Sequence, residues 1–156
     1  MGCGLSKPIA FNEAMLQAIT FGNKTQTRRP LRVQPPEEFM VKEARPLYNG
    51  SLDYAIGVGP KVWPPIPQPG FRYPYGKNGD VLSVKGSNMR LLVTGVFLER
   101  IQDIQPHEIK AEGIEDSAGM LLGFKQLWDS IYKDKFLGWD TNPWVFTTHF
   151  ERIETE

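Results

Sequence analysis

Residues 30–79 hold ten of the thirteen prolines and six of the glycines, and this stretch limits what the chain can fold into. No hydrophobic period of 2 or 3.6 residues persists there, and loops of this length are often functional or mobile. Its aromatic residues, including Trp63 and Phe71, need partners to pack on, which argues against simple disorder. We predict one domain spanning residues 1–156, with an ordered but irregular insertion at about 30–75 that could cover a cleft.

The segment before this insertion is predicted to form a short amphipathic helix at residues 13–21. Asn12 is a favourable helix cap, and apolar residues recur at helical spacing after it. Gly22 marks the expected end of the helix. The polar residues 23–29 follow directly, so the helix delivers them at its C-terminal end.

The remaining elements are predicted from periodicity and from turn residues. Pro106 and Gly113 suit the two ends of a short helix, and Gly95 suits a bulge within a strand. The expected strands lie at residues 5–11, 81–84, 91–98 and 144–153, and the expected further helices at 106–112 and 118–132. Few helices and scattered strands do not fit a parallel βαβ array. The predicted fold class is α+β: a small antiparallel or mixed β-barrel with short peripheral helices.

Opposite charges gather in the two halves of the chain, although the net charge is zero. Residues 1–98 carry 12 Lys and Arg against 6 Asp and Glu, whereas residues 99–156 carry 6 against 12. This asymmetry indicates either a basic face for an anionic partner or two halves that pair with each other in the fold.

Cysteine and histidine usage predicts no disulfide, no metal site and no cofactor. Cys3 is the only cysteine, and His107 and His149 do not form a zinc-site spacing. Without an apolar run of 18 residues or a signal peptide, we expect a cytoplasmic protein with no membrane contact. Residues 1–6 fit the N-myristoylation pattern, with Cys3 as a second acylation site. That anchored alternative needs a eukaryotic transferase, whereas the rest of the chain is typical of bacterial or viral proteins.

Residues 24–29, Lys-Thr-Gln-Thr-Arg-Arg, concentrate three cations and two hydroxyl groups. These side chains all donate hydrogen bonds, and an arginine can hold a phosphate through two parallel bonds. Thr25, Arg28 and Arg29 are therefore candidates for binding a substrate or a nucleic acid. The alternative, which composition alone favours, is a solvated loop whose cations stabilise the C-terminus of the preceding helix.

Lys24 and Thr27 also have a catalytic interpretation. A lysine that is desolvated beside other cations loses basicity and can act as a general base near neutral pH. The neutral amine of Lys24 would then take the proton of Thr27 and make it a nucleophile. Glu112 is a candidate to orient the lysine or to pass protons, although a carboxylate at a helix end is more often simply exposed.

Three tryptophans in the second half of the chain are candidates for stacking on a base. Trp128 follows the apolar period of the helix at 118–132, which favours a place in the core. Trp139 and Trp144 lie in a turn-rich stretch, so they are better candidates for the wall of a pocket.

Residues 22–29, Gly-Asn-Lys-Thr-Gln-Thr-Arg-Arg, resemble the Gly-x-Lys-Thr-x-Thr-x-Arg signature of ASCH domains, which are PUA-like β-barrel domains. Gly-Asp-Val-Leu at 79–82, Ala-Glu-Gly-Ile at 111–114 and the stretch 124–131 agree in order. Gly-Trp-Asp-x-Asn-Pro-Trp-Val at 138–145 is similar to phage and prophage members of the family. The resemblance covers nearly the whole chain except the insertion.

The resemblance implies RNA binding by analogy with PUA domains. Some small family members are amidohydrolases that remove the acetyl group from N-acetylcytidine. Their lysine, threonine and glutamate match Lys24, Thr27 and Glu112, so the resemblance implies that these residues act as base, nucleophile and helper.

The strand after residues 79–80 departs from the phage-type pattern. Those members continue into Trp-Val-Arg-Glu, whereas this chain has Ser-Val-Lys-Gly at 83–86. Lys85 stands where an arginine is expected and is a further candidate binding residue. If the missing tryptophan and glutamate line the ligand pocket, substrate choice changes or activity is lost, so the sequence leaves enzyme status open.

Three functions remain as expectations. The first is binding of RNA, a nucleoside or a nucleotide at residues 24–29. The second is deacetylation of N-acetylcytidine-like nucleosides by the Lys, Thr and Glu residues. The third is a non-catalytic module that contacts a host protein through residues 34–72, if the chain is phage-encoded.

Overall fold

The computed structural model describes residues 8–31, 34, 56–58, 61–63, 75–76, 78–115 and 118–153. The acylation pattern at the N-terminus lies outside these residues, and so does most of the proline-rich insertion, including most of the segment 34–72.

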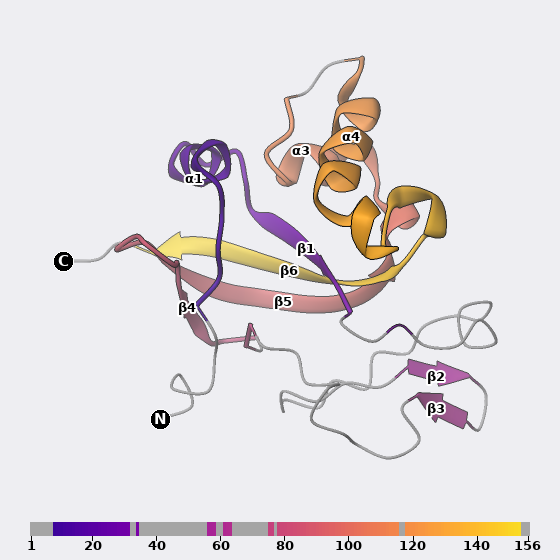
Figure 1. Cartoon of the computed structure of the whole chain (residues 1–156). Helices are drawn as coiled ribbons and strands as arrows, with labels where there is room; N and C mark the ends of the chain where they lie inside the picture. The colour runs from indigo at the N-terminus through magenta and orange to yellow at the C-terminus, as the bar shows by residue number, and fades with distance from the viewer. Residues whose placement is uncertain are drawn as a thin grey trace.

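A four-stranded antiparallel sheet curls into a half-barrel, with the strands in the order β1-β6-β5-β4 (Figure 1). Its strands are β1 (Gln26–Pro30), β4 (Val81–Ser83), β5 (Arg90–Arg100) and β6 (Trp144–Ile153). The long strands β5 and β6 form its centre, and the register between them shifts between Val93 and Gly95, as expected for a bulge. Together with the helices, this sheet confirms the predicted α+β class, and its curled antiparallel half-barrel is consistent with the predicted small barrel.

In the described part of the chain three helices pack on the sheet, and the sequence marks the ends of two of them, α1 and α3. They are α1 (Glu13–Thr20), α3 (Pro106–Ala111) and α4 (Met120–Tyr132). The Asn12 side chain accepts from the backbone N–H of Met15 at 2.8 Å and caps α1 as predicted. Gly22 and Gly113 follow α1 and α3 with φ of 82° and 96°, a conformation that glycine adopts at little cost.

Short 3-10 turns connect these elements. They are η3 (Ile101–Asp103), η4 (Lys133–Lys135) and η5 (Trp139–Thr141). No helix in the described part of the chain is long and apolar enough to cross a bilayer.

Most buried apolar residues of the described part of the chain belong to two clusters. One joins α1 to the strands, and the other joins α3, α4 and η5 to the start of β6. The first cluster comprises Ile9, Ile19, Leu82, Val84, Leu91, Val93 and Phe150. The second comprises Ile101, Ile104, Ile109, Phe124, Trp128, Trp139 and Val145.

The structure differs from the sequence expectations at three places. Residues 26–30 form strand β1 rather than a solvated loop after α1, because they pair with residues 145–149 of β6. Within the range predicted to be irregular, β2 (Ile56–Val58) and β3 (Lys61–Trp63) form a short antiparallel ladder. Of the strand predicted at 5–11, the described residues contribute only a parallel bridge from Ile9 to Val84.

Candidate functional site

Strand β1 carries the Lys-Thr-Gln-Thr-Arg-Arg segment into the fold. Lys24 forms an isolated antiparallel bridge with Glu112, and the backbone N–H of Thr25 donates to the carbonyl of Ala111 at 2.8 Å. Gly113 makes this approach possible, because a Cβ there would lie 3.3 Å from the Cβ of Lys24. The end of α3 and the start of β1 are thus brought together across 88 residues of sequence.

Lys24 is only 2% exposed, and its ammonium group is fully hydrogen-bonded. Its Nζ donates to the backbone carbonyls of Gln26 at 2.9 Å and of Glu112 at 2.8 Å. It also donates to Oε1 of Glu112 at 3.3 Å, which makes an ion pair. Three donors meet three oxygens, so the charged lysine is satisfied despite its burial.

Burial lowers the pKa of Lys24 from its ordinary value of 10.5, and the charges of Arg28 and Arg29 add to this effect. The carboxylate of Glu112 opposes it by favouring the charged form. This is the electrostatic setting that a lysine base requires, although the same lysine now holds three oxygens in place.

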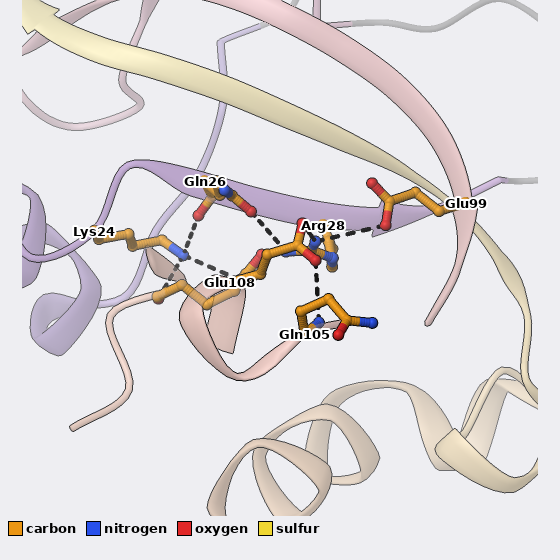
Figure 2. A network of polar contacts seen from close by, with 7 residues as sticks. Lys24, Gln26, Arg28, Glu99, Gln105 and Glu108 are labelled. Carbon is orange, nitrogen blue, oxygen red and sulfur yellow. Dashed lines mark hydrogen bonds and ion pairs between the residues drawn. The ribbon is translucent and has the colours of Figure 1, made fainter. Parts of the chain in front are cut away.

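Arg28 occupies the centre of a buried network of carboxylates (Figure 2). Its side chain is fully buried, and it donates to Oε2 of Glu112 at 3.0 Å and to Oε2 of Glu108 at 2.8 Å. Oε2 of Glu99 lies 3.7 Å away, and the side chain of Gln26 accepts at 3.1 Å. Buried charges are tolerated when they are paired in this way.

A cleft of about 280 Å³ opens above β1, between α1 and α4. Thr27, Arg28, Arg29 and Glu112 contribute its polar side. The other side chains around it come from the start of α1 and from one face of α4, and most are apolar or aromatic. They belong to Ala10, Phe11, Asn12, Met15, Phe124, Leu127, Trp128, Ile131 and Tyr132.

Arg29 follows Arg28 in sequence but has different surroundings. Its Nη2 donates to the backbone carbonyl of Ala10 at 2.8 Å, and its guanidinium carbon lies 5.3 Å from the ring centre of Phe11. The ring of Tyr75 lies 6.0 Å away. Burial raises the pKa of Tyr132, while the charge of Arg29 and its hydrogen bond to Tyr132 oppose this shift.

Two further groups near the network have shifted pKa values. Burial raises the pKa of Glu99, and the charge of Glu108 adds to the shift while Arg28 opposes it. Burial lowers the pKa of His149, and the charge of Arg28 lowers it further. Both shifts follow mainly from removing these groups from water, and nearby charges modify them.

The structure brings some of the predicted site residues together and separates others. Thr27, Arg28, Arg29 and Glu112 line one cleft, and Lys24 contacts Glu112 directly beside it. Thr25 has an exposed side chain before β1 and is not among the residues that line the cleft.

Lys85 and two tryptophans lie outside this group. Lys85 is exposed in the turn after β4, with its backbone N–H bonded to the carbonyl of Ile9. Trp139 is buried against Phe124, with ring centres 6.2 Å apart. Trp144 is buried beneath the guanidinium of Arg100. Neither tryptophan lines the cleft in the described part of the chain.

Sequence reasoning missed several residues of this site. Glu99 and Glu108 had no motif, and only the excess of acidic residues in the second half of the chain hinted at partners for the basic segment. Trp128 was expected in the core; it is buried and also lines the cleft, with its indole N–H donating to the carbonyl of Leu137 at 2.8 Å. Tyr132, one helical turn further along α4, carried no separate signal.

Comparison of the chain with protein-family models, with curated proteins and with solved structures finds no match. Within the described ranges, no group of three or more His, Cys, Asp or Glu side chains is arranged to hold a metal ion.

Proposed function

We propose that this chain is a PUA-like domain of the ASCH type that binds one nucleoside-sized planar ligand in the cleft between α1 and α4. The observation that carries this proposal is the cleft itself, whose polar floor on β1 faces an aromatic and aliphatic wall on α4. Its volume of about 280 Å³ is close to the lower end of the range for ligand sites, roughly 300–1,000 Å³. A polar floor and apolar walls suit a flat ring with polar edges.

The floor also offers a hydrogen-bond donor. The Nε of Arg28 is buried and has no hydrogen-bond partner among the described residues. A buried donor without a partner costs about 1–3 kcal/mol. A ligand oxygen that reaches it would remove this cost, which supports binding of a ligand with a carbonyl group at its edge.

Direct binding of an RNA backbone by the whole basic segment has weaker support. Lys24 and Arg28 are buried and already paired with carboxylates, so a phosphate would have to displace Glu108 or Glu112. An enclosed nucleoside site therefore agrees better with the geometry than a phosphate-binding surface along residues 24–29.

A second candidate function is hydrolysis of an acylated nucleoside. It is favoured by Glu112, which contacts Lys24 and lines the same cleft as Thr27. In this proposal the neutral amine of Lys24 takes the proton of Thr27, and the threonine oxygen bonds to the amide carbonyl carbon. The carbon–nitrogen bond breaks, the leaving amine receives the proton, and water then releases the acyl group as a carboxylate and restores Thr27.

Both candidates can be tested together with cytidine and N-acetylcytidine. Calorimetry with cytidine measures binding, and chromatography of N-acetylcytidine reactions measures cytidine release. Hydrolysis predicts that Thr27→Ala and Lys24→Ala abolish release, whereas Thr27→Ser retains part of it. Thr94→Ala, which removes an exposed hydroxyl on β5, is the matched control and should keep wild-type turnover.

Binding without release would support the first candidate and exclude the second for this substrate. If wild-type protein neither binds cytidine nor releases it from N-acetylcytidine, the proposed nucleoside site is contradicted.

A further inference from the structure

The charged residues that line the cleft do not cancel one another. They are Arg28, Arg29 and Glu112. Glu112 pairs with Arg28 at 3.0 Å, and Arg28 is paired again with Glu108 at 2.8 Å. Arg29, in contrast, has no carboxylate within 4.0 Å among the described residues. Arg29 is thus a cation of the cleft that no described carboxylate pairs within 4.0 Å.

Arg29 is also held in place. Its Nη2 is bound by the carbonyl of Ala10, and its guanidinium lies near the rings of Phe11 and Tyr75. Tyr132, on α4, lines the same cleft, and the charge of Arg29 opposes the rise in its pKa that burial causes. A guanidinium has five N–H donors, so these contacts fix the group and still leave donors for a ligand. An arginine fixed in this way loses less entropy when it binds an oxyanion.

We infer that Arg29 makes this cleft select a nucleoside monophosphate over the neutral nucleoside. This inference rests on the proposed nucleoside site and names the chemical class of its ligand. The base occupies the space between β1 and α4, and the phosphate accepts hydrogen bonds from Arg29. The cleft has room for one small ligand, so the geometry points to a free mononucleotide rather than a polymer.

Arg28 and Arg29 differ in their ion-pair partners. The two arginines are adjacent in sequence and equally able to hold a phosphate as isolated side chains. Only the network of Glu108 and Glu112 removes Arg28 from that role. The phosphate specificity is therefore assigned to one side chain.

The test compares cytidine 5′-monophosphate with cytidine by calorimetry at low salt. We expect the wild type to bind the monophosphate at least tenfold more tightly, a difference of about 1.4 kcal/mol. Arg29→Gln should bring the two affinities within about twofold of each other, mainly by weakening the monophosphate, as expected for loss of one charged hydrogen-bond partner. Arg152→Gln makes the same substitution at an exposed position near the end of β6 and should keep the wild-type ratio.

Several results would overturn the inference. Equal affinities in the wild type would do so, and so would a preference for the monophosphate that survives Arg29→Gln. Tighter binding of a cytidylate oligomer than of the monophosphate would overturn the assignment to a free mononucleotide. If neither cytidine nor its monophosphate binds, the nucleoside site itself fails and this inference fails with it.

If Arg29→Gln does not fold, as judged by circular dichroism, the salt dependence of binding to the wild type tests the inference. The affinity for the monophosphate should fall as salt rises from about 0.05 to about 0.5 M, while the affinity for cytidine stays nearly constant, because salt screens the charge contact. Parallel salt dependence of the two ligands would contradict a role for Arg29 in binding phosphate.

Discussion

Arg28 lies in a closed network of carboxylates, whereas Arg29, the next residue along β1, lies at the wall of a cleft beside aromatic rings. The first arginine joins β1 to α3 and β5 through three glutamates. The second leaves part of its hydrogen-bonding capacity unused by the described residues. Adjacent arginines thus differ in their partners: Arg28 is paired with carboxylates of the fold, whereas Arg29 has no described carboxylate within 4.0 Å. Four substitutions test this comparison.

The largest loss of stability is expected from Arg28→Met. It fills similar space but leaves the half-buried Glu108 without its cation and the buried Glu112 with Lys24 alone. Breaking a buried ion pair from one side costs about 3–5 kcal/mol of stability. Urea unfolding would measure this loss. Arg152→Met on the exposed end of β6 is the control and should change stability by less than about 0.5 kcal/mol.

Lys24→Met tests the same network through the dependence of stability on pH. The pKa of Lys24 is lowered in the folded chain, so the unfolded chain binds more protons between that lowered value and 10.5. Lys24 therefore makes wild-type stability rise with pH across this window. Urea midpoints measured from about pH 7 to about pH 10 should show a rising contribution in the wild type that Lys24→Met lacks. Parallel pH profiles would show that Lys24 titrates normally.

Arg29→Gln should cost much less stability than Arg28→Met. It removes the contacts to Phe11 and Tyr75, each worth about 0.5–1 kcal/mol at partly exposed sites, and no ion pair to a described carboxylate. We expect a loss of about 1–2 kcal/mol in urea unfolding. A loss as large as that of Arg28→Met would mean that the two arginines are equally structural.

Glu99→Gln should change the free energy of unfolding least. The sign of this change shows whether burial or pairing with Arg28 dominates at Glu99. The pKa of Glu99 is raised in the fold, so ionised Glu99 is penalised there and wild-type stability falls as pH rises through the window from 4.5 to the raised value. The neutral amide of the variant does not pay this penalty. The stability of the variant relative to the wild type should therefore increase with pH. Because the contact with Arg28 is long, at 3.7 Å, we expect the variant to be about as stable as the wild type at about pH 5. At about pH 7–8 we expect it to be slightly more stable. A growing deficit instead would make Glu99 a true partner of Arg28.

Local signals in the sequence predicted most of the fold. The cap at Asn12, the proline at 106 and the glycines at 22 and 113 mark helix ends through backbone chemistry that depends on few neighbours. The long strands β5 and β6 are rich in residues that favour strands. These elements could be predicted because their causes lie within a few residues.

Strand β1 could not be predicted in the same way. Gln-Thr-Arg-Arg-Pro shows no apolar alternation, and it becomes a strand only because β6 pairs with it over residues 145–149. Its burial likewise depends on Glu108 and Glu112, 80 and 84 residues further along the chain than Arg28. The charge asymmetry between the halves of the chain indicated such pairing, but not which residues would pair.

The site could be predicted only in part, because its residues also come from distant parts of the sequence. Lys24, Thr27 and Glu112 were grouped by chemistry and by resemblance, and the structure places Lys24 against Glu112 with Thr27 on the adjoining cleft. The wall of the cleft could not be anticipated, because Trp128 and Tyr132 face it only through the way α4 packs over β1. What these residues do remains a prediction.

The most direct test of the cleft is an NMR titration of ¹⁵N-labelled protein with cytidine. We expect the shifts to concentrate on the backbone amides of Thr27, Arg29 and Glu112 and on the indole N–H of Trp128, while the amide of Arg152 stays in place. Saturable shifts confined to these groups would locate the ligand between β1 and α4. Absence of shifts there at millimolar cytidine, or shifts centred elsewhere, would contradict the cleft as the working site of the protein.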